Sequence, residues 1–366
     1  MKKPFILVSV AAALILLLGT AARLLGYVNT PPQPHEPQRF DAVSELSDFE
    51  AELREYVSDN AEYIRKIYKI PAGELPPEPD SACYGETTDP QEVQAVIDAA
   101  AELLDGQETI WSPDIDFAPK SVIRYYRDDT ILVIAWQEAP EGRGCSFVEV
   151  KLADSSQLRR KVSGEYGSQR VQTATALAAE DNAVIAISGD FYLLRSSYGI
   201  AVYKGNIEHC YDRVTDTCFV TEGGDLLVHH RGGFADEAEA RKFVEDNNVD
   251  FSLIFGPILV ENGELQDISP SYPVGEVGDR YSRSAIGQRG ELHYLLMTVC
   301  FEQNYGTCTA YDEARFMHAK GLDVAYALDG GHTATITMGG RLYNRPDWGE
   351  EKQISDVICF ASAMYD

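Results

Sequence analysis

Basic side chains are scarce in this sequence. Its 366 residues include 31 Lys and Arg against 58 Asp and Glu, which gives a formal net charge of −27. The field of such a chain repels phosphate backbones and anionic membrane surfaces, so nucleic acid is excluded as a main partner. An anionic substrate would need a local cationic pocket or a bound metal ion to overcome this field.

Three motifs that mark common classes of enzyme are also absent. The sequence has no phosphate-loop lysine motif, no dinucleotide-binding glycine fingerprint and no Gly-x-Ser-x-Gly nucleophile elbow. None of its 7 cysteines has the Cys-x2-Cys spacing of a zinc site, and its 7 histidines are scattered apart from His229 and His230. The sequence therefore predicts no cofactor, although it leaves a requirement for a divalent cation open.

One long uncharged run stands at the N-terminus. Residues 5–22 carry no charge and follow Lys2 and Lys3, which is typical of a signal peptide or a membrane anchor. Small residues at 20–22 would suit cleavage and secretion, but residues 24–28 prolong the apolar character beyond them. We therefore predict an uncleaved signal anchor over residues 1–28. Its single transmembrane helix would leave the N-terminus inside and the bulk of the chain outside the cell, in the cell membrane.

An extracellular location makes the cysteines informative, because disulfides persist in oxidising compartments. Two pairs of cysteines, Cys210 with Cys218 and Cys300 with Cys308, have the same Cys-x7-Cys spacing. Each pair flanks a turn-forming stretch. We predict a disulfide within each pair. The odd number of cysteines leaves at least one thiol free or paired with another chain.

The first part of the exported chain reads as a spacer followed by helices and a hairpin. Residues 29–42 are rich in proline and predict an extended spacer. Within a region that we place at residues 43–140, apolar spacing predicts a helix over 43–70 and another from Pro90 to about Leu104. Two strands joined at residues 127–129 predict a hairpin. The sequence does not decide whether this region is an accessory layer or the start of the main domain.

From residue 145 onward, short strands are punctuated by glycine and helices are few. We therefore predict an α+β domain over residues 145–366, with a mixed, mostly antiparallel sheet as its core. The predicted strands cover residues 147–152, 183–187, 199–203, 226–230, 251–255, 284–287, 292–299, 324–328 and 354–360. The predicted helices cover residues 173–180, 237–247 and 311–320. No internal repeat is present.

Two of these strands deliver a carboxylate at their ends. The strand at 183–187 is followed by Ser188, Gly189 and Asp190, and the strand at 324–328 is followed directly by Asp329 and two glycines. Glycine lets the backbone approach a ligand closely, and paired carboxylates serve glycosyl transfer as nucleophile and acid or base. The alternative is that each aspartate only caps a turn or a helix.

Arginine and histidine side chains near these motifs are further candidates. Arg283 precedes a strand and Arg195 follows Asp190, so either could bind a phosphate or carboxylate, although a loop arginine is also commonly a plain surface residue. His332 and Thr333 suggest a His-activated hydroxyl, but adjacent side chains rarely point the right way for that. We interpret them as the wall of a pocket.

Five motifs in a fixed order give the sequence a resemblance. They are Ile-Ser-Gly-Asp-Phe-Tyr at 187–192, Gly-Ile-Ala-Val-Tyr-Lys-Gly at 199–205, Phe-Gly-Pro-Ile-Leu-Val-Glu-Asn-Gly at 255–263, Arg-Ser-Ala-Ile-Gly at 283–287 and Leu-Asp-Gly-Gly-His-Thr-Ala-Thr at 328–335. This set resembles the phosphodiester glycosidase family from about Phe147 to Phe360. Ser188 stands where the family usually has Asn, and Thr333 where it usually has Ser. If the missing amide binds substrate in relatives, the substrate here differs.

The resemblance implies hydrolysis of a sugar-1-phosphodiester on a cell-surface glycan or exopolysaccharide. It implies Asp329 as the principal carboxylate and Asp190 as its partner, or as a ligand of a metal or sugar. Substrate-binding roles fall to Arg283, Gly189, Gly330, Gly331, His332, Thr333 and Arg195. Two alternatives remain open, namely a non-catalytic glycan-binding or envelope-scaffold domain and an ordinary glycoside hydrolase.

Overall fold

The computed structural model describes residues 68–115, 122–190, 198–299 and 307–365, all within one compact unit, Ile67–Asp366. The predicted anchor and spacer lie outside the described residues, as does the predicted helix at 43–70 up to residue 67. Among the described residues, no helix is long and apolar enough to span a bilayer.

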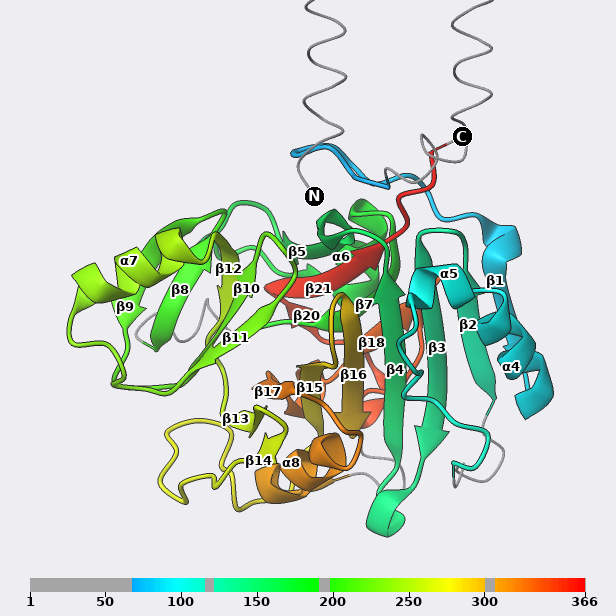
Figure 1. Cartoon of the computed structure of the whole chain (residues 1–366). Helices are drawn as coiled ribbons and strands as arrows, with labels where there is room; N and C mark the ends of the chain where they lie inside the picture. The colour runs from blue at the N-terminus through cyan, green and yellow to red at the C-terminus, as the bar shows by residue number, and fades with distance from the viewer. Residues whose placement is uncertain (1–67, 116–121, 191–197, 300–306, 366) are drawn as a thin grey trace, which may run out of the picture. The chain divides into compact units, whose positions relative to one another are not determined.

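A nine-stranded antiparallel sheet forms the centre of the unit (Figure 1). Its order is β1-β2-β3-β4-β16-β15-β17-β13-β14. The strands are β1 (Tyr84–Thr87), β2 (Ile123–Arg127), β3 (Ile131–Glu138), β4 (Cys145–Leu152), β16 (His293–Val299), β15 (Arg283–Gln288), β17 (Val324–Leu328), β13 (Ile258–Glu261) and β14 (Glu264–Leu265). The hairpin β2–β3 pairs with β4, so the strands before residue 140 extend the same sheet as those after residue 145.

Two five-stranded sheets and one strand pair complete the β structure. The first has the order β11 (Leu226–His229), β10 (Thr217–Thr221), β12 (Val249–Leu253), β8 (Gly199–Tyr203) and β9 (Asn206–Tyr211). The second has the order β19 (Arg341–Leu342), β18 (Ile336–Met338), β7 (Ala183–Ser188), β21 (Asp356–Ala361) and β5 (Leu158–Val162). The strand pair is β20 (Gln353–Ile354) with β6 (Gln172–Thr173). A mixed fold with mostly antiparallel sheets is therefore confirmed.

Helices are few among the described residues, and all but the shortest begin at a side-chain cap. They are α4 (Pro90–Asp98), α5 (Ala101–Leu104), α6 (Ala174–Glu180), α7 (Glu237–Asp246) and α8 (Ala310–His318). Asp89 caps α4 ahead of Pro90, and Thr309 forms a capping box with Asp312 at α8, which satisfies backbone donors that have no partner inside the helix. The single helix predicted from Pro90 to Leu104 is interrupted between Asp98 and Ala101.

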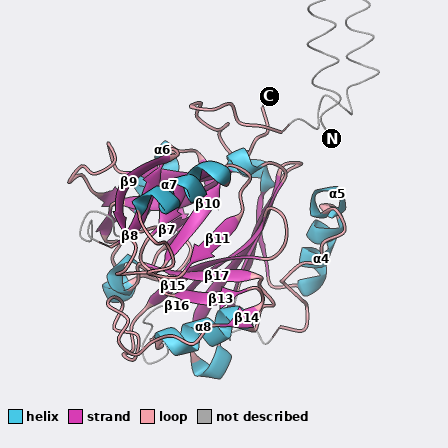
Figure 2. Cartoon of the chain, turned by 60° about the vertical axis from the view of Figure 1, so that its left-hand side comes forward, coloured by secondary structure: helices cyan, strands magenta, loops and turns pink. Residues whose placement is uncertain are grey.

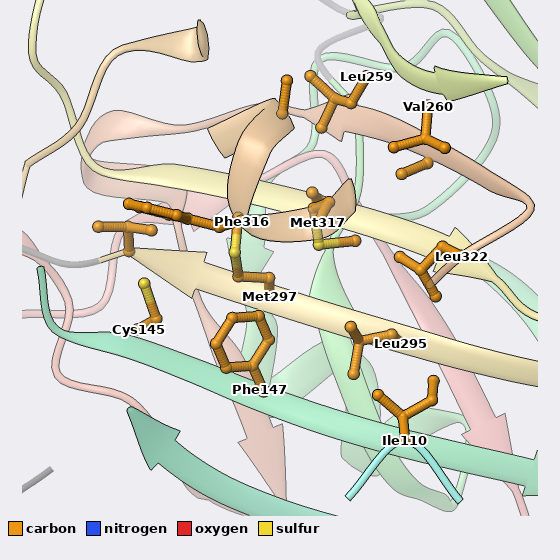
Figure 3. Close-up of a cluster of buried hydrophobic side chains, with 14 of the residues drawn as sticks. Ile110, Cys145, Phe147, Leu259, Val260, Leu295, Met297, Phe316, Met317 and Leu322 are labelled. Carbon is orange, nitrogen blue, oxygen red and sulfur yellow. The ribbon is translucent and has the colours of Figure 1, made fainter. Parts of the chain in front are cut away.

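Both faces of the nine-stranded sheet are buried, because alternate residues of each strand enter different cores. On β16, Leu295 and Met297 join a cluster that includes Phe316 and Met317 of α8 (Figure 3). Leu296, from the same strand, joins a second cluster, which also holds residues of β7, β10 and β21. The sheet thus lies between helices on one side and the smaller sheets on the other (Figure 2).

The predicted disulfide between Cys210 and Cys218 is wrong. Both are free thiols. Cys210 lies on β9 and Cys218 lies on β10, and strands β8 and β12 separate these two strands in the sheet. Neighbouring strands lie about 4.8 Å apart, so three strand spacings exceed the reach of a disulfide. Cys308 is also a free thiol, buried in the core, and Cys300 lies outside the described residues.

Candidate active site

The two carboxylate motifs meet where two sheets adjoin. Strand β17 of the nine-stranded sheet ends at Leu328, and the next residue, Asp329, donates its backbone N–H to the carbonyl oxygen of Gly189 at 3.3 Å. Gly189 directly follows β7, which belongs to a five-stranded sheet. Asp329 is half-buried, whereas residues 325–328 before it are buried. The structure therefore brings the backbones of the two motifs together.

The loop after Asp329 is fixed against the start of β15. Gly331 donates its N–H to the carbonyl oxygen of Ser282 at 2.8 Å. A Cβ atom on Gly330 would lie 2.5 Å from that same oxygen, so only glycine fits there. Gly331 has open space around it but a φ of +62°, which a non-glycine residue adopts only under strain. The two glycines are thus required for different reasons, one steric and one conformational.

His332 and Thr333 form a short helical turn, η4 (Gly331–Thr333). The Thr333 hydroxyl donates to the carbonyl oxygen of Gly330 at 2.7 Å, and its side chain is largely buried. The His332 ring lies against the indole ring of Trp348, in a second turn, η5 (Asp347–Gly349). With its hydroxyl turned onto the loop backbone, Thr333 supports the wall of the site and is poorly placed as a nucleophile.

Asp190 lies in a buried ion cluster beneath this loop. Its side chain has 0% exposed surface and lies 3.9 Å from the guanidinium of Arg160 on β5. Arg160 also pairs with Asp356 at 2.6 Å and donates to the carbonyl oxygen of Ser252. Burial by itself would lower the pKa of Arg160, because it disfavours the charged guanidinium. The carboxylates of Asp356 and Asp190 have a larger, opposite effect, so the pKa of Arg160 is raised.

The cluster also fixes the backbone around Asp190. The Asp190 N–H donates to Asp356 Oδ1 at 3.0 Å, and Asp190 Oδ2 accepts the N–H of Ile254. A Cβ atom on Gly189 would meet the Asp356 carboxylate at 2.8 Å, so the approach of these two strands needs a glycine. Asp190 is thus placed to hold Gly189, and through it the Asp329 backbone, at a set position. No part of its carboxylate faces solvent.

Arg283 uses its guanidinium to hold backbone carbonyl groups. Its Nη1 donates to Gly275 O at 2.6 Å, and its Nη2 donates to Glu276 O at 3.2 Å and Asp279 O at 2.9 Å. Its Nε donates to Cys308 O at 3.3 Å, and the side chain is buried. The backbone of Arg283 lies beside Gly330, but its side chain is committed to these loops. The other predicted arginine, Arg195, lies outside the described residues.

Glu313, on α8, is a titratable residue that the sequence reading did not single out. Its carboxyl group is fully buried, and neither oxygen has a hydrogen-bond partner within the described structure. Burial raises the pKa of Glu313 to about 8, although the positive charge of Arg283 partly opposes this. The carboxyl group is therefore protonated at neutral pH, and it lies close enough to Arg283 to interact with its charge.

A pocket of about 270 Å³ lies beside β17. Its wall includes Pro257, whose carbonyl oxygen accepts the N–H of Ala327 at 3.0 Å, two residues before Asp329. Arg231 also lines this pocket, and its guanidinium carbon lies 5.1 Å from the centre of the Tyr272 ring. Asp329 itself does not line the pocket. Within the described ranges no group of three or more His, Cys, Asp or Glu could hold a metal ion.

Comparisons with known proteins agree with this geometry. Residues 181–361 match the model of the family described as phosphodiester glycosidase. The zebrafish N-acetylglucosamine-1-phosphodiester alpha-N-acetylglucosaminidase catalytic domain, auto-inhibited by its pro-peptide, is similar at 17% identity, with a TM-score of 0.50. That match covers 63% of this chain and 83% of the zebrafish chain.

A hypothetical protein from Synechocystis is similar at 13% identity and a TM-score of 0.48, over 67% of this chain and 64% of that one. A search of the curated proteins gives no match. At such identities a solved structure supports the fold alone, while the family model covers both carboxylate motifs. The resemblance seen in the sequence is thereby confirmed: residues 181–361 of this chain match the phosphodiester glycosidase family.

Proposed function

We propose that this protein hydrolyses the bond between the anomeric carbon of a sugar and a phosphodiester on a cell-surface or extracellular glycan. The observation that carries the proposal is the position of Asp329. This half-buried residue directly follows strand β17, and the Asp329 loop is hydrogen-bonded to Gly189 on one side and to Ser282 on the other. Gly189, Ser282 and Asp329 all lie within the residues that match the family model.

The proposed reaction depends more on one well-placed carboxylate than on a strong general acid. When the bond from C1 to the phosphate oxygen breaks, its electron pair leaves with the phosphate, which is far less basic than a sugar alkoxide. Positive charge then develops at C1 and the ring oxygen. In our proposal the carboxylate of Asp329 stabilises this charge, water adds to C1, and the water proton passes to solvent.

The burial of Asp190 favours a positioning role for it. A carboxylate without exposed surface cannot contact a sugar unless the site rearranges, whereas its contacts with Arg160 and the backbone act on the geometry of the Asp329 loop. The same reasoning applies to Arg283, whose four hydrogen bonds hold loop carbonyls. Direct contact of Arg283 with the phosphate stays a prediction from the sequence.

The proposed location rests on the N-terminal sequence. The uncharged run at residues 5–22 behind Lys2 and Lys3 supports a signal anchor that exposes the domain outside the cell. Protease added to intact cells should then remove the domain, and should leave it whole if the domain faces the cytoplasm.

The decisive experiment compares Asp329→Asn with Asp279→Asn, an exposed aspartate on a nearby loop. The substrate is the methyl phosphodiester of N-acetylglucosamine 1-phosphate, and released sugar and methyl phosphate are measured. We expect kcat/KM to fall by more than about 100-fold in Asp329→Asn and to be unchanged in the control. Full turnover by Asp329→Asn would refute the role of Asp329.

Two further outcomes separate the alternatives. Wild-type protein that binds the phosphodiester without releasing sugar would be a glycan-binding or scaffold domain. Equal turnover of a neutral methyl glycoside, which lacks phosphate, would identify an ordinary glycoside hydrolase.

A further inference from the structure

Trp348 is the most exposed large apolar side chain among the described residues. Its relative exposure is 81%, whereas Trp111 and Trp136 are 2% and 0% exposed. Leaving an indole ring in water forgoes the free energy that its burial would give, so packing does not explain this residue. Its surroundings are polar, since Arg345, Gly349, Glu350 and Lys352 are also exposed. The exposed neighbours of Trp348 in the sequence thus offer it no apolar cover.

The backbone at Trp348 is also unusual. Its φ of +65° and ψ of 4° lie in the left-handed region, which disfavours a side chain with a Cβ. Glycine or asparagine would suit this turn better. The turn is closed by the N–H of Gly349, which donates to the carbonyl oxygen of Pro346 at 3.0 Å. Neither turn chemistry nor core packing accounts for tryptophan here, and strained residues of this kind gather at functional sites.

One residue ties this turn to the Asp329 loop. Ser282 donates its hydroxyl to Asp347 Oδ1 at 2.6 Å, and its carbonyl oxygen accepts the N–H of Gly331 at 2.8 Å. The Trp348 indole ring also lies against the His332 ring. The exposed ring is thus held beside the loop that carries the proposed catalytic carboxylate, on a turn anchored independently of the ring itself.

We propose that the Trp348 indole is a stacking platform for the pyranose ring whose anomeric carbon is presented to Asp329. The C–H groups on one face of a pyranose pack against an aromatic face, while its hydroxyl groups remain in water. Such a contact needs no positive charge, which suits a chain with a net charge of −27. An isolated ring fits one sugar unit and is too small for a protein partner. The assignment rests on the proposed function, because it names the substrate group that this site holds.

Tryptophan fluorescence tests the platform without any need for turnover. The chain has 3 tryptophans, and the other two are buried, so an emission change on sugar binding reports on Trp348. The probes are the methyl phosphodiester of N-acetylglucosamine 1-phosphate and free N-acetylglucosamine, glucose and galactose. We expect a saturable change in emission in the wild type and none in Trp348→Phe, which keeps an aromatic ring but loses the indole signal.

Kinetics give the second measurement. Trp348→Ala should raise KM for the phosphodiester by roughly ten-fold while kcat changes little, and Trp348→Phe should lie between it and the wild type. Tyr211→Ala, which removes an exposed aromatic ring from β9, is the matched control and should leave KM unchanged. Melting temperatures of all variants should match the wild type or exceed it, so a rise in KM does not reflect unfolding.

The outcomes separate this proposal from the proposed function. An emission change without hydrolysis would refute the enzyme and keep the platform. Hydrolysis with an unchanged KM in Trp348→Ala would keep the enzyme and overturn the platform. A wild-type emission spectrum that none of the four probes alters would overturn the platform as well.

Discussion

The backbone N–H of Asp329 donates to the carbonyl oxygen of Gly189 at 3.3 Å, across the junction of two sheets. Asp329 directly follows strand β17 and Gly189 directly follows strand β7, so any shift of one sheet against the other moves the proposed catalytic carboxylate. The residues that fix this junction are therefore the ones whose substitution should be most informative.

Gly330 and Gly331 should respond differently to the same substitutions. Gly330→Ala places a Cβ atom against the Ser282 carbonyl oxygen, so both alanine and asparagine should displace the loop and reduce kcat. Gly331→Ala faces open space and should cost roughly 1–2 kcal/mol from its left-handed backbone. Gly331→Asn should recover much of this, because asparagine tolerates that conformation. Denaturant unfolding and kcat check the pattern, and equal behaviour of both asparagine variants would contradict it.

Asp190→Asn tests whether the buried carboxylate positions the loop or takes part in the reaction. Removing its charge leaves Arg160 paired with Asp356 and weakens the charge-assisted bond from the Ile254 N–H, which should lower the free energy of unfolding by about 1.5–3 kcal/mol. The control is Asp181→Asn, which breaks a more exposed pair with Arg159 and should cost about 1 kcal/mol or less. An Asp190→Asn protein of wild-type stability that has lost turnover would instead assign Asp190 to the chemistry.

Arg283→Lys should loosen the loop at residues 275–279. Lysine cannot reproduce the fork that holds the carbonyl groups of Gly275, Glu276 and Asp279, and the loss should cost on the order of 2–4 kcal/mol. Amide hydrogen exchange in the loop should speed up, while Arg280→Lys, an exposed neighbour, should change neither quantity. A raised KM for the phosphodiester with normal stability and exchange would show that Arg283 binds phosphate directly.

Glu313→Gln should remove a pH dependence of stability. The pKa of Glu313 is raised from 4.5 to about 8 by burial, so between these values the folded protein keeps a proton that the unfolded chain has lost. The free energy of unfolding should then be highest below pH 4.5 and fall by about 1.4 kcal/mol per pH unit up to about pH 8. Denaturant titrations at pH 5 to 8 check this. The same slope in Glu313→Gln would contradict it, and exposed Glu264→Gln is the surface-charge control.

The elements with clear local signals could be predicted from the sequence. The apolar run after Asn182 became β7, and the amphipathic pattern before Gly321 became α8, each within two residues of its predicted bounds. That Asp190 and Asp329 act in one site stays a prediction from their motifs. These features depend on residues that are close in the sequence or on a resemblance that already contains the fold.

The remainder depends on contacts between distant residues, which a single sequence does not show. Arg160 lies in a strand with other charged residues, and nothing local distinguishes it as the partner of Asp190 and Asp356. The direction of the Arg283 side chain is decided by carbonyl groups from two other loops. The sequence pattern does indicate that Glu313 is unusual, because this residue falls on the otherwise apolar face of α8.

The contacts of Ser282 determine how much of the chain must be present before the proposed site is complete. Its carbonyl oxygen and its hydroxyl hold the Asp329 loop and the Trp348 turn, both of which follow it in the chain, and the loop also needs β7 from much earlier. No stretch of the chain carries the complete site by itself. A polypeptide still emerging from the ribosome therefore lacks part of the proposed site until residue 348 has been made.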